Sequence, residues 1–115
     1  MAFDPGLAQT LRDALADRPV TEQRMFGGLA FLLHGHMVCG VHKGGAMVRV
    51  GKDHYAAALQ LPGVAPMMFT GKPMVAMVDI GDASVEDDTV RGALLAMALA
   101  TVQALPPKVA KPAKR

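Results

Sequence analysis

Between Arg24 and Gly51, apolar residues alternate with polar or small ones, and glycines recur at short intervals. The apolar runs are separated by His34-Gly35 and by Gly44-Gly45, and glycine readily adopts the positive φ angles of two-residue hairpin turns. This pattern is typical of consecutive antiparallel strands. We predict a three-stranded meander with strands over residues 29–33, 36–42 and 46–50.

Two-residue turns also predict which side chains share a face of the sheet. One face is almost wholly apolar and is the expected core face, with Ala30, Leu32, Met37, Cys39, Val41, Val48 and Val50. The other, which we call the mixed sheet face, combines Leu29, Phe31, Leu33, Val38 and Met47 with His36, His42 and Arg49. It is too apolar for free solvent and too polar for a dry core. A three-residue turn at either place would shift the register and change this division.

Further elements flank the meander. Asp4-Pro5 is a good helix start because aspartate caps a helix and proline suits its first position, and leucines at four-residue spacing follow. A short helix is predicted over residues 52–60. An extended stretch over 67–69 and a strand over 74–80 would enlarge the sheet to four or five antiparallel strands. The residues before Gly27-Gly28 would extend the first strand backwards across a bulge.

The last predicted helix starts at Ser84 as N-cap, with Asp87 placed as in a capping box. Its 14 residues from Gly92 to Leu105 are apolar nearly all round and too few to cross a bilayer. A helix that is apolar on every side is buried on every side, so the second side points to another subunit. The fold class is therefore α+β, an antiparallel meander with an amino-terminal helix, a short middle helix and a long carboxy-terminal helix packed on the sheet.

Length and charge divide the chain into a domain and a tail. The 115 residues are enough for one domain, which we place at 1–105. Residues 106–115 hold four cations, three prolines and no acid, so we predict a disordered basic tail. Without these four cations the formal net charge falls from +2 to −2. The amino terminus does not resemble a signal peptide, so we expect a cytoplasmic location without membrane contact.

Motifs of enzyme and cofactor sites are missing from the sequence. It holds no dinucleotide-binding fingerprint, nucleophile elbow or zinc-protease motif, and Gly71-Lys72 lacks the rest of a phosphate loop. We therefore expect no catalytic constellation and no cofactor. The only cysteine, Cys39, cannot form an internal disulfide and is expected to be a buried structural thiol.

The histidines do not predict a metal site either. His36 and His42 would share a face but lie about 20 Å apart along one strand, which is too far for one ion. We predict no carboxylate beside either of them. Helix ends and turns explain most of the acidic residues, whereas Asp79 lies in a strand and is the least explained.

Four polar residues are not explained as helix caps and are the candidate ligand-binding residues: Arg24, His42, Arg49 and Lys72. His42 and Arg49 fall on the mixed sheet face. One interpretation is that they are charges on the rim of an apolar surface, which their long side chains partly cover. The alternative is a site for a small anion or an acidic peptide on that face.

Three short motifs suggest a family. They are Arg24-Met25-Phe26-Gly27-Gly28, the strand Met37-x-Cys39-Gly40, and Phe69-Thr70-Gly71-Lys72-Pro73-Met74, in this order. With them, the chain from Leu7 to Leu105 resembles the TfoX amino-terminal domain of the TfoX/Sxy family. The resemblance implies an antiparallel sheet with flanking helices and a link to competence regulators that act with the transcription machinery. It implies no catalytic residues. The full regulators carry a second helical domain, where this sequence has only the Pro/Lys tail.

We therefore expect a stand-alone, non-enzymatic regulatory or protein-interaction domain that forms a homodimer through the last helix or the mixed sheet face. The first alternative is a small-ligand binder or an unrecognised enzyme that uses Arg24, His42, Arg49 or Lys72. The second is weak nucleic-acid binding through the basic tail. Nucleic acid is the less expected partner, because the folded part is slightly acidic and lacks the interleaved aromatic residues of a stacking surface.

Overall fold

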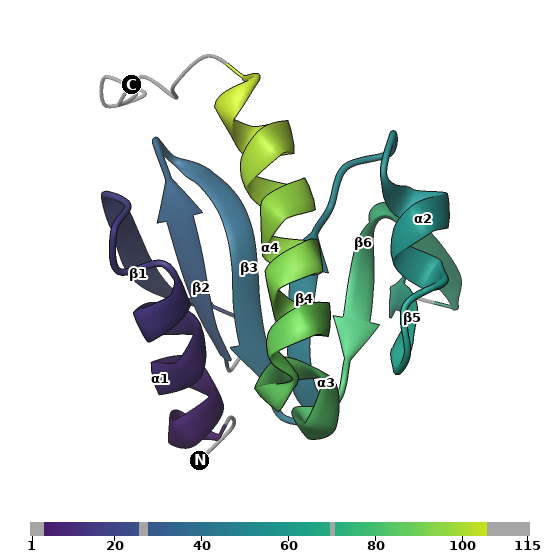
Figure 1. Ribbon diagram of the computed structural model, residues 1–115, viewed down its shortest axis with the longest axis horizontal. Helices are drawn as coiled ribbons and strands as arrows, with labels where there is room; N and C mark the ends of the chain where they lie inside the picture. The colour runs from purple at the N-terminus through teal and green to yellow at the C-terminus, as the bar shows by residue number, and fades with distance from the viewer. Residues whose placement is uncertain (1–3, 26–27, 70, 106–115) are drawn as a thin grey trace.

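The computed structural model describes residues 4–25, 28–69 and 71–105, so the predicted tail at 106–115 lies outside the described residues. These residues form a six-stranded sheet in the order β1-β2-β3-β4-β6-β5, and every neighbouring pair of strands is antiparallel. The elements are α1 (Pro5–Ala14), β1 (Val20–Met25), β2 (Gly28–Leu33), β3 (His36–His42), β4 (Gly45–Arg49), α2 (Tyr55–Leu59), β5 (Val64–Phe69), β6 (Lys72–Ile80), α3 (Asp82–Glu86) and α4 (Asp88–Gln103). The predicted α+β class is confirmed (Figure 1).

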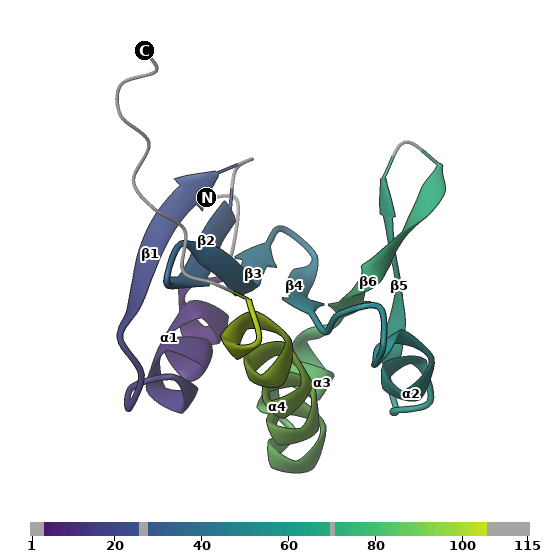
Figure 2. The same cartoon turned by 90° about the horizontal axis from the view of Figure 1, so that it is seen from above.

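All the described helices lie on one side of the sheet (Figure 2). The long helix α4 packs on β3 and β4, α1 lies beside it, and α2 contacts β5 and β6. The core fills the space between these helices and the sheet, where Leu11, Phe31 and Leu94 are fully buried. Cys39 is also fully buried there, which confirms the prediction of a buried thiol.

The pairing of β2 with β3 corrects the predicted division of the two faces. Leu33 faces His36 as expected, across a turn in which both central residues have positive φ angles. The register then shifts between Phe31 and Leu32, because Val38 is an extra residue that forms a β-bulge. Phe31 therefore faces Cys39, not Val38. As a result the residues that we placed on the mixed sheet face belong to the core instead: Leu29, Phe31, Leu33 and Val38.

The second turn lies one residue earlier than predicted. Its central residues are Lys43 and Gly44, because His42 faces Gly45. Val41 consequently faces Ala46, whereas a turn at Gly44-Gly45 would have placed it opposite Val48. This change moves the pairing by two positions, and an even shift keeps each side chain on its expected face. The predicted faces of β3 and β4 around this turn therefore hold.

Strand β1 is a separate edge strand and not an extension of β2. Its residues pair with β2 throughout, so that Val20 faces Leu33 and Arg24 faces Leu29. Residues 21–24 are polar and exposed. Polar side chains are typical of an edge strand, which is paired on one side only. The sequence pattern of a buried strand is therefore absent, and this strand was not predicted.

The last helical segment is divided into α3 and α4. Asp87 caps α4, since its Oδ1 accepts the N–H groups of Thr89 and Val90 at 2.9 and 3.0 Å. Ser84, the predicted N-cap, lies within α3 and donates its hydroxyl to the carbonyl of Pro62 at 3.2 Å. The middle of the side of α4 that faces away from the sheet carries small residues, namely Gly92, Ala96 and Ala100. The helix is thus apolar all round while it exposes little apolar surface, and a dimer through it stays a prediction.

Candidate functional site

The side of the sheet that faces away from the helices is the candidate functional surface. We call it the uncovered face and define it by Leu32, Met37, His42, Met47, Arg49, Met77 and Asp79, all of them partly exposed. They share this side because their neighbours along each strand point into the core and side chains alternate along a strand. No helix of the described part of the chain lies over it (Figure 2).

Methionine side chains lie across the middle of the uncovered face. A Cβ atom placed on Gly40 would be 3.2 Å from the Cε methyl of Met47 and 3.3 Å from that of Met37, so both methyls lie over this glycine. Ala30, which faces Gly40, is fully buried on the same side. Since methionine has a flexible and polarisable side chain, this centre can adapt its shape to whatever binds it.

A histidine–aspartate pair forms the polar part of this surface. The Nε2 atom of His42 lies 2.7 Å from Oδ1 of Asp79, across the intervening strand β4, where Gly45 has no side chain to separate them. The backbone N–H of Gly44 donates to Nδ1 of His42 at 3.0 Å. An accepting Nδ1 places the proton of the neutral ring on Nε2, which donates to Asp79. Both ring nitrogens are engaged, which argues against a role as metal ligand or general base.

This pair corrects the expectation that no carboxylate lies beside His42. It also explains Asp79, for which the sequence offered no role. The two residues are 37 positions apart and belong to strands that are not direct neighbours. The strand register joins them, and no local motif could have found the contact.

The four candidate ligand-binding residues do not come together in the structure. Arg49 lies on the uncovered face, but it is four residues along β4 from the position that faces His42, or about 13 Å. Among the described residues, no hydrogen bond or ion pair reaches the guanidinium group of Arg49. Arg24 lies on the side of the helices, and Lys72 is exposed at the start of β6. Two of the four therefore share the uncovered face.

Arg24 lines a hollow of about 520 Å³ between α1 and the strands β1 and β2. Arg12 crosses this hollow and donates from Nε and Nη2 to the two carboxylate oxygens of Glu22, and from Nη1 to Gln9. The hydrogen bond from Arg12 lowers the pKa of the Glu22 carboxyl. Because these partners already occupy the guanidinium group of Arg12, we do not interpret the hollow as an anion site. The ion pair between Arg12 and Glu22 joins α1 to the edge strand β1.

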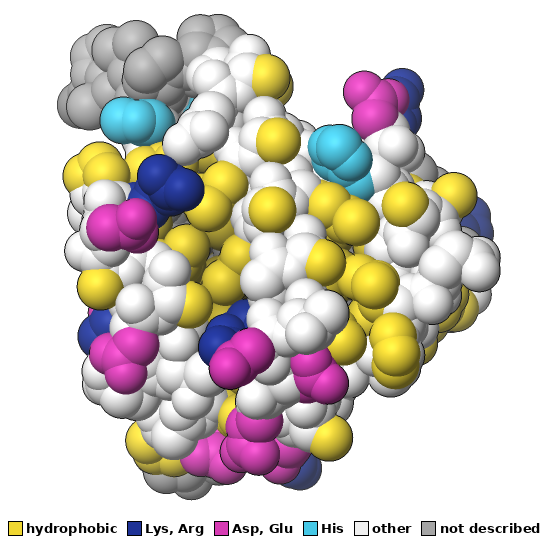
Figure 3. Space-filling view, viewed as in Figure 1, with side chains coloured by type: hydrophobic (Ala, Val, Ile, Leu, Met, Phe, Trp, Pro, Cys, Tyr) yellow, Lys and Arg dark blue, Asp and Glu magenta, His cyan; other side chains and the backbone are white. Residues whose placement is uncertain are grey.

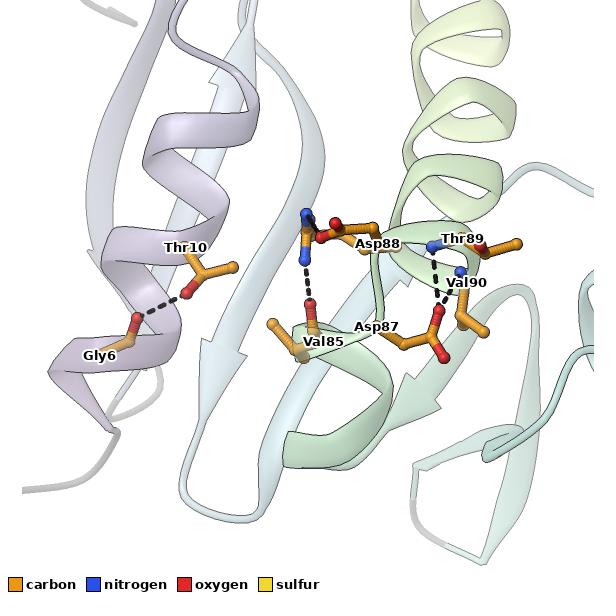
Figure 4. A network of polar contacts seen from close by, with 8 residues as sticks. Gly6, Thr10, Val85, Asp87, Asp88, Thr89 and Val90 are labelled. Carbon is orange, nitrogen blue, oxygen red and sulfur yellow. Dashed lines mark hydrogen bonds and ion pairs between the residues drawn. The ribbon is translucent and has the colours of Figure 1, made fainter.

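A second hollow, of about 470 Å³, lies between α1 and the start of α4. Figure 3 shows acidic side chains around this end of the molecule. Arg91 lines it and donates to the carbonyl of Val85 at 2.7 Å and to Asp88, while Thr10 donates to Gly6 at 3.0 Å (Figure 4). These hydrogen bonds lie within α1 and within α4, or join α4 to α3.

The described part of the chain holds no cluster of three potential metal ligands. Among its helices, none has the length and apolar character needed to span a membrane.

Comparison with known proteins gives one match. The family model of the TfoX N-terminal domain matches residues 11–102, a range that includes every strand of the sheet and the whole uncovered face. No curated protein and no solved structure matches the chain. The family match agrees with the resemblance that the three sequence motifs suggested.

Proposed function

The chain belongs to the TfoX N-terminal domain family, and we propose that it is a non-enzymatic regulatory domain that binds a protein through its uncovered face. One observation carries the proposal: helices cover one side of the sheet, while no described helix covers the side that holds Leu32, Met37, Met47 and Met77. An apolar centre with charged groups at its margin is the usual composition of a protein-binding surface. The regulatory role that the family implies would be exercised in the cytoplasm through this surface.

The chemistry of the face favours a protein partner over a small anion. His42 is bonded at both ring nitrogens, and Arg49 is the one cation of the set that defines the face. The two hollows described above lie away from Arg49, beside α1. A surface with adaptable methionines suits contact with another protein better than enclosure of a small ligand.

Site-specific photo-crosslinking in cells tests this proposal. A photoreactive amino acid replaces Met47 on the uncovered face, and in a control chain it replaces Gln103, which is exposed on α4. We expect covalent protein adducts of defined mass from position 47 and none from position 103. The adducts at position 47 should be lost when Arg49→Glu is added, because this change alters the charge of the surface and leaves the core intact. Equal labelling at both positions, or none at position 47, would contradict the proposal.

A further inference from the structure

We propose that the partner at the uncovered face is a second copy of this chain, which forms a two-fold symmetric, face-to-face dimer. The inference rests on the proposed function, since it names the occupant of the same surface. Its basis is the arrangement of charges on β4 and β6, which is complementary to itself.

Four side chains of these strands form the corners of a rectangle on the uncovered face. Met47 faces Asp79, and Arg49 faces Met77. Neighbouring strands are about 4.8 Å apart, and alternate residues along a strand are about 6.8 Å apart. Arg49 and Asp79 therefore occupy one diagonal of the rectangle, and the two methionines occupy the other.

A two-fold axis in the plane of the interface, along the methionine diagonal, exchanges the two charged corners. Each Arg49 then lies close to Asp79 of the other copy, and Met47 and Met77 each meet their own counterpart. Such a two-fold interface uses the same patch on both subunits. The strands of the two copies would cross at roughly 70°, which is nearer to orthogonal than to aligned sheet packing.

Within one chain, the side chains of Arg49 and Asp79 can each still form an ion pair with a second copy. The side chain of Arg49 has no hydrogen bond or ion pair among the described residues. Asp79 uses Oδ1 for His42, which orients the carboxylate, and its side chain is still 42% exposed. Its second oxygen can accept from a guanidinium group. Two reciprocal ion pairs around a methionine centre would set the orientation of the two copies.

The outer side of α4 offers no comparable argument. The exposed residues in the middle of this side, Gly92, Ala96 and Ala100, carry neither charge nor hydrogen-bonding side chains that would fix an orientation. Of the two surfaces that could form a homodimer, the uncovered face is the one whose charges match themselves.

The test measures molecular mass by light scattering or native mass spectrometry for four versions of the full chain. These are the wild type, Arg49→Glu, Asp79→Arg, and the control Lys52→Glu, which reverses an exposed charge before α2. We expect the wild type and the control to have about twice the chain mass of 12.1 kDa. Each of the two face variants should dimerise at least about a hundredfold more weakly, because like charges then meet twice in the interface. Circular dichroism shows whether both variants keep their fold.

Mixing the two face variants gives the sharpest result. In the heterodimer, Glu at position 49 of one chain meets Arg at position 79 of the other, and the native pair Arg49–Asp79 is kept once. Dimers should therefore return in the mixture, although neither variant forms them alone. A mixture that stays monomeric would overturn the reciprocal pairing, and variants that remain dimeric alone would place the interface elsewhere.

A wild-type chain that is monomeric up to its solubility limit would also overturn the inference. In that case the photo-crosslinking at position 47 still decides the proposed function separately. Adducts with a different protein would keep the interaction surface and remove the second copy as its occupant. If position 47 gives no adducts, both the inference and the proposed function fail.

Discussion

Burial and hydrogen bonding determine what single residues of this chain can do. The prediction that Cys39 is a core residue was correct because it follows from local alternation along one strand. The contact between His42 and Asp79 could not be predicted, since it depends on which strands lie beside β4. Two predictions concern individual side chains.

The first concerns the reactivity of Cys39. Burial raises the pKa of its thiol to about 12, and only the thiolate is nucleophilic. We expect the folded protein to show no reaction with a thiol reagent at pH 8, and one thiol per chain to react at once in denaturant. Absorbance of the released chromophore measures both. Rapid labelling of the native protein would contradict the position of Cys39 in the core.

The second concerns the ion pair between Arg12 and Glu22. The hydrogen bond from Arg12 lowers the pKa of Glu22 below its ordinary value of 4.5. The unfolded chain therefore binds this proton more readily, so the pair stabilises the fold above about pH 4.5 and less as the pH falls below it. We expect Glu22→Gln to lower the Tm by about 2 °C at pH 7, because the pair is largely exposed. The difference should shrink at pH 3, and an effect that grows on acidification would contradict this.

At the scale of elements, one tight turn and one helix start were predicted correctly, because neighbouring residues determine them. The turn at His34-Gly35 and the helix start at Asp4-Pro5 are both confirmed. The β-bulge at Val38 was missed, and with it the face of β2, because one extra residue moves every following side chain to the other side. The polar edge strand β1 was missed because it does not need an apolar pattern.

The turn between β3 and β4 gives a prediction for an element. Gly45 has a φ angle of +147°, and an added Cβ would lie 2.2 Å from the backbone carbonyl oxygen of Ile80. We expect Gly45→Ala to destabilise the fold by roughly 3 kcal/mol, since backbone atoms cannot yield as a flexible side chain could. Denaturant unfolding at a fixed protein concentration measures the free energy of unfolding.

The control for this variant is Gly92→Ala in α4. An added Cβ at Gly92 meets no atom within 4 Å, and alanine favours a helix over glycine. We expect this change to stabilise the fold by about 0.5–1 kcal/mol. If both glycines tolerated alanine equally, the close contact between Gly45 and β6 would not be real.

At the scale of the whole molecule, all the described helices lie on one side of the sheet and leave the uncovered face without a helix over it. The long apolar helix α4 suggested a second covered side, but the residues in the middle of its outward side are small. We predicted an interaction surface on this helix or on the mixed sheet face, and we now propose the uncovered face of the sheet. It includes Met47, Arg49 and His42 of the mixed sheet face, and it replaces Phe31 by Met37 and Met77.

Thermal unfolding tests the dimer for the molecule as a whole. If unfolding separates two subunits, mass action makes the Tm rise with protein concentration. We expect this rise for the wild type and a Tm independent of concentration for Arg49→Glu. Differential scanning fluorimetry over a wide concentration range measures both, and a wild-type Tm that does not change with concentration would argue against a dimer.

Neighbouring residues were sufficient to predict the α+β class, the turn at His34-Gly35, the burial of Cys39 and the family of the chain. The covered face of β2, the contact of His42 with Asp79 across β4 and the position of Arg49 diagonally opposite Asp79 could be seen only once the strands were paired. The physical reason is that turn and helix preferences act over a few residues. Strand register depends on every residue between the paired positions. One inserted residue moves the side chains beyond it to the other face of the sheet.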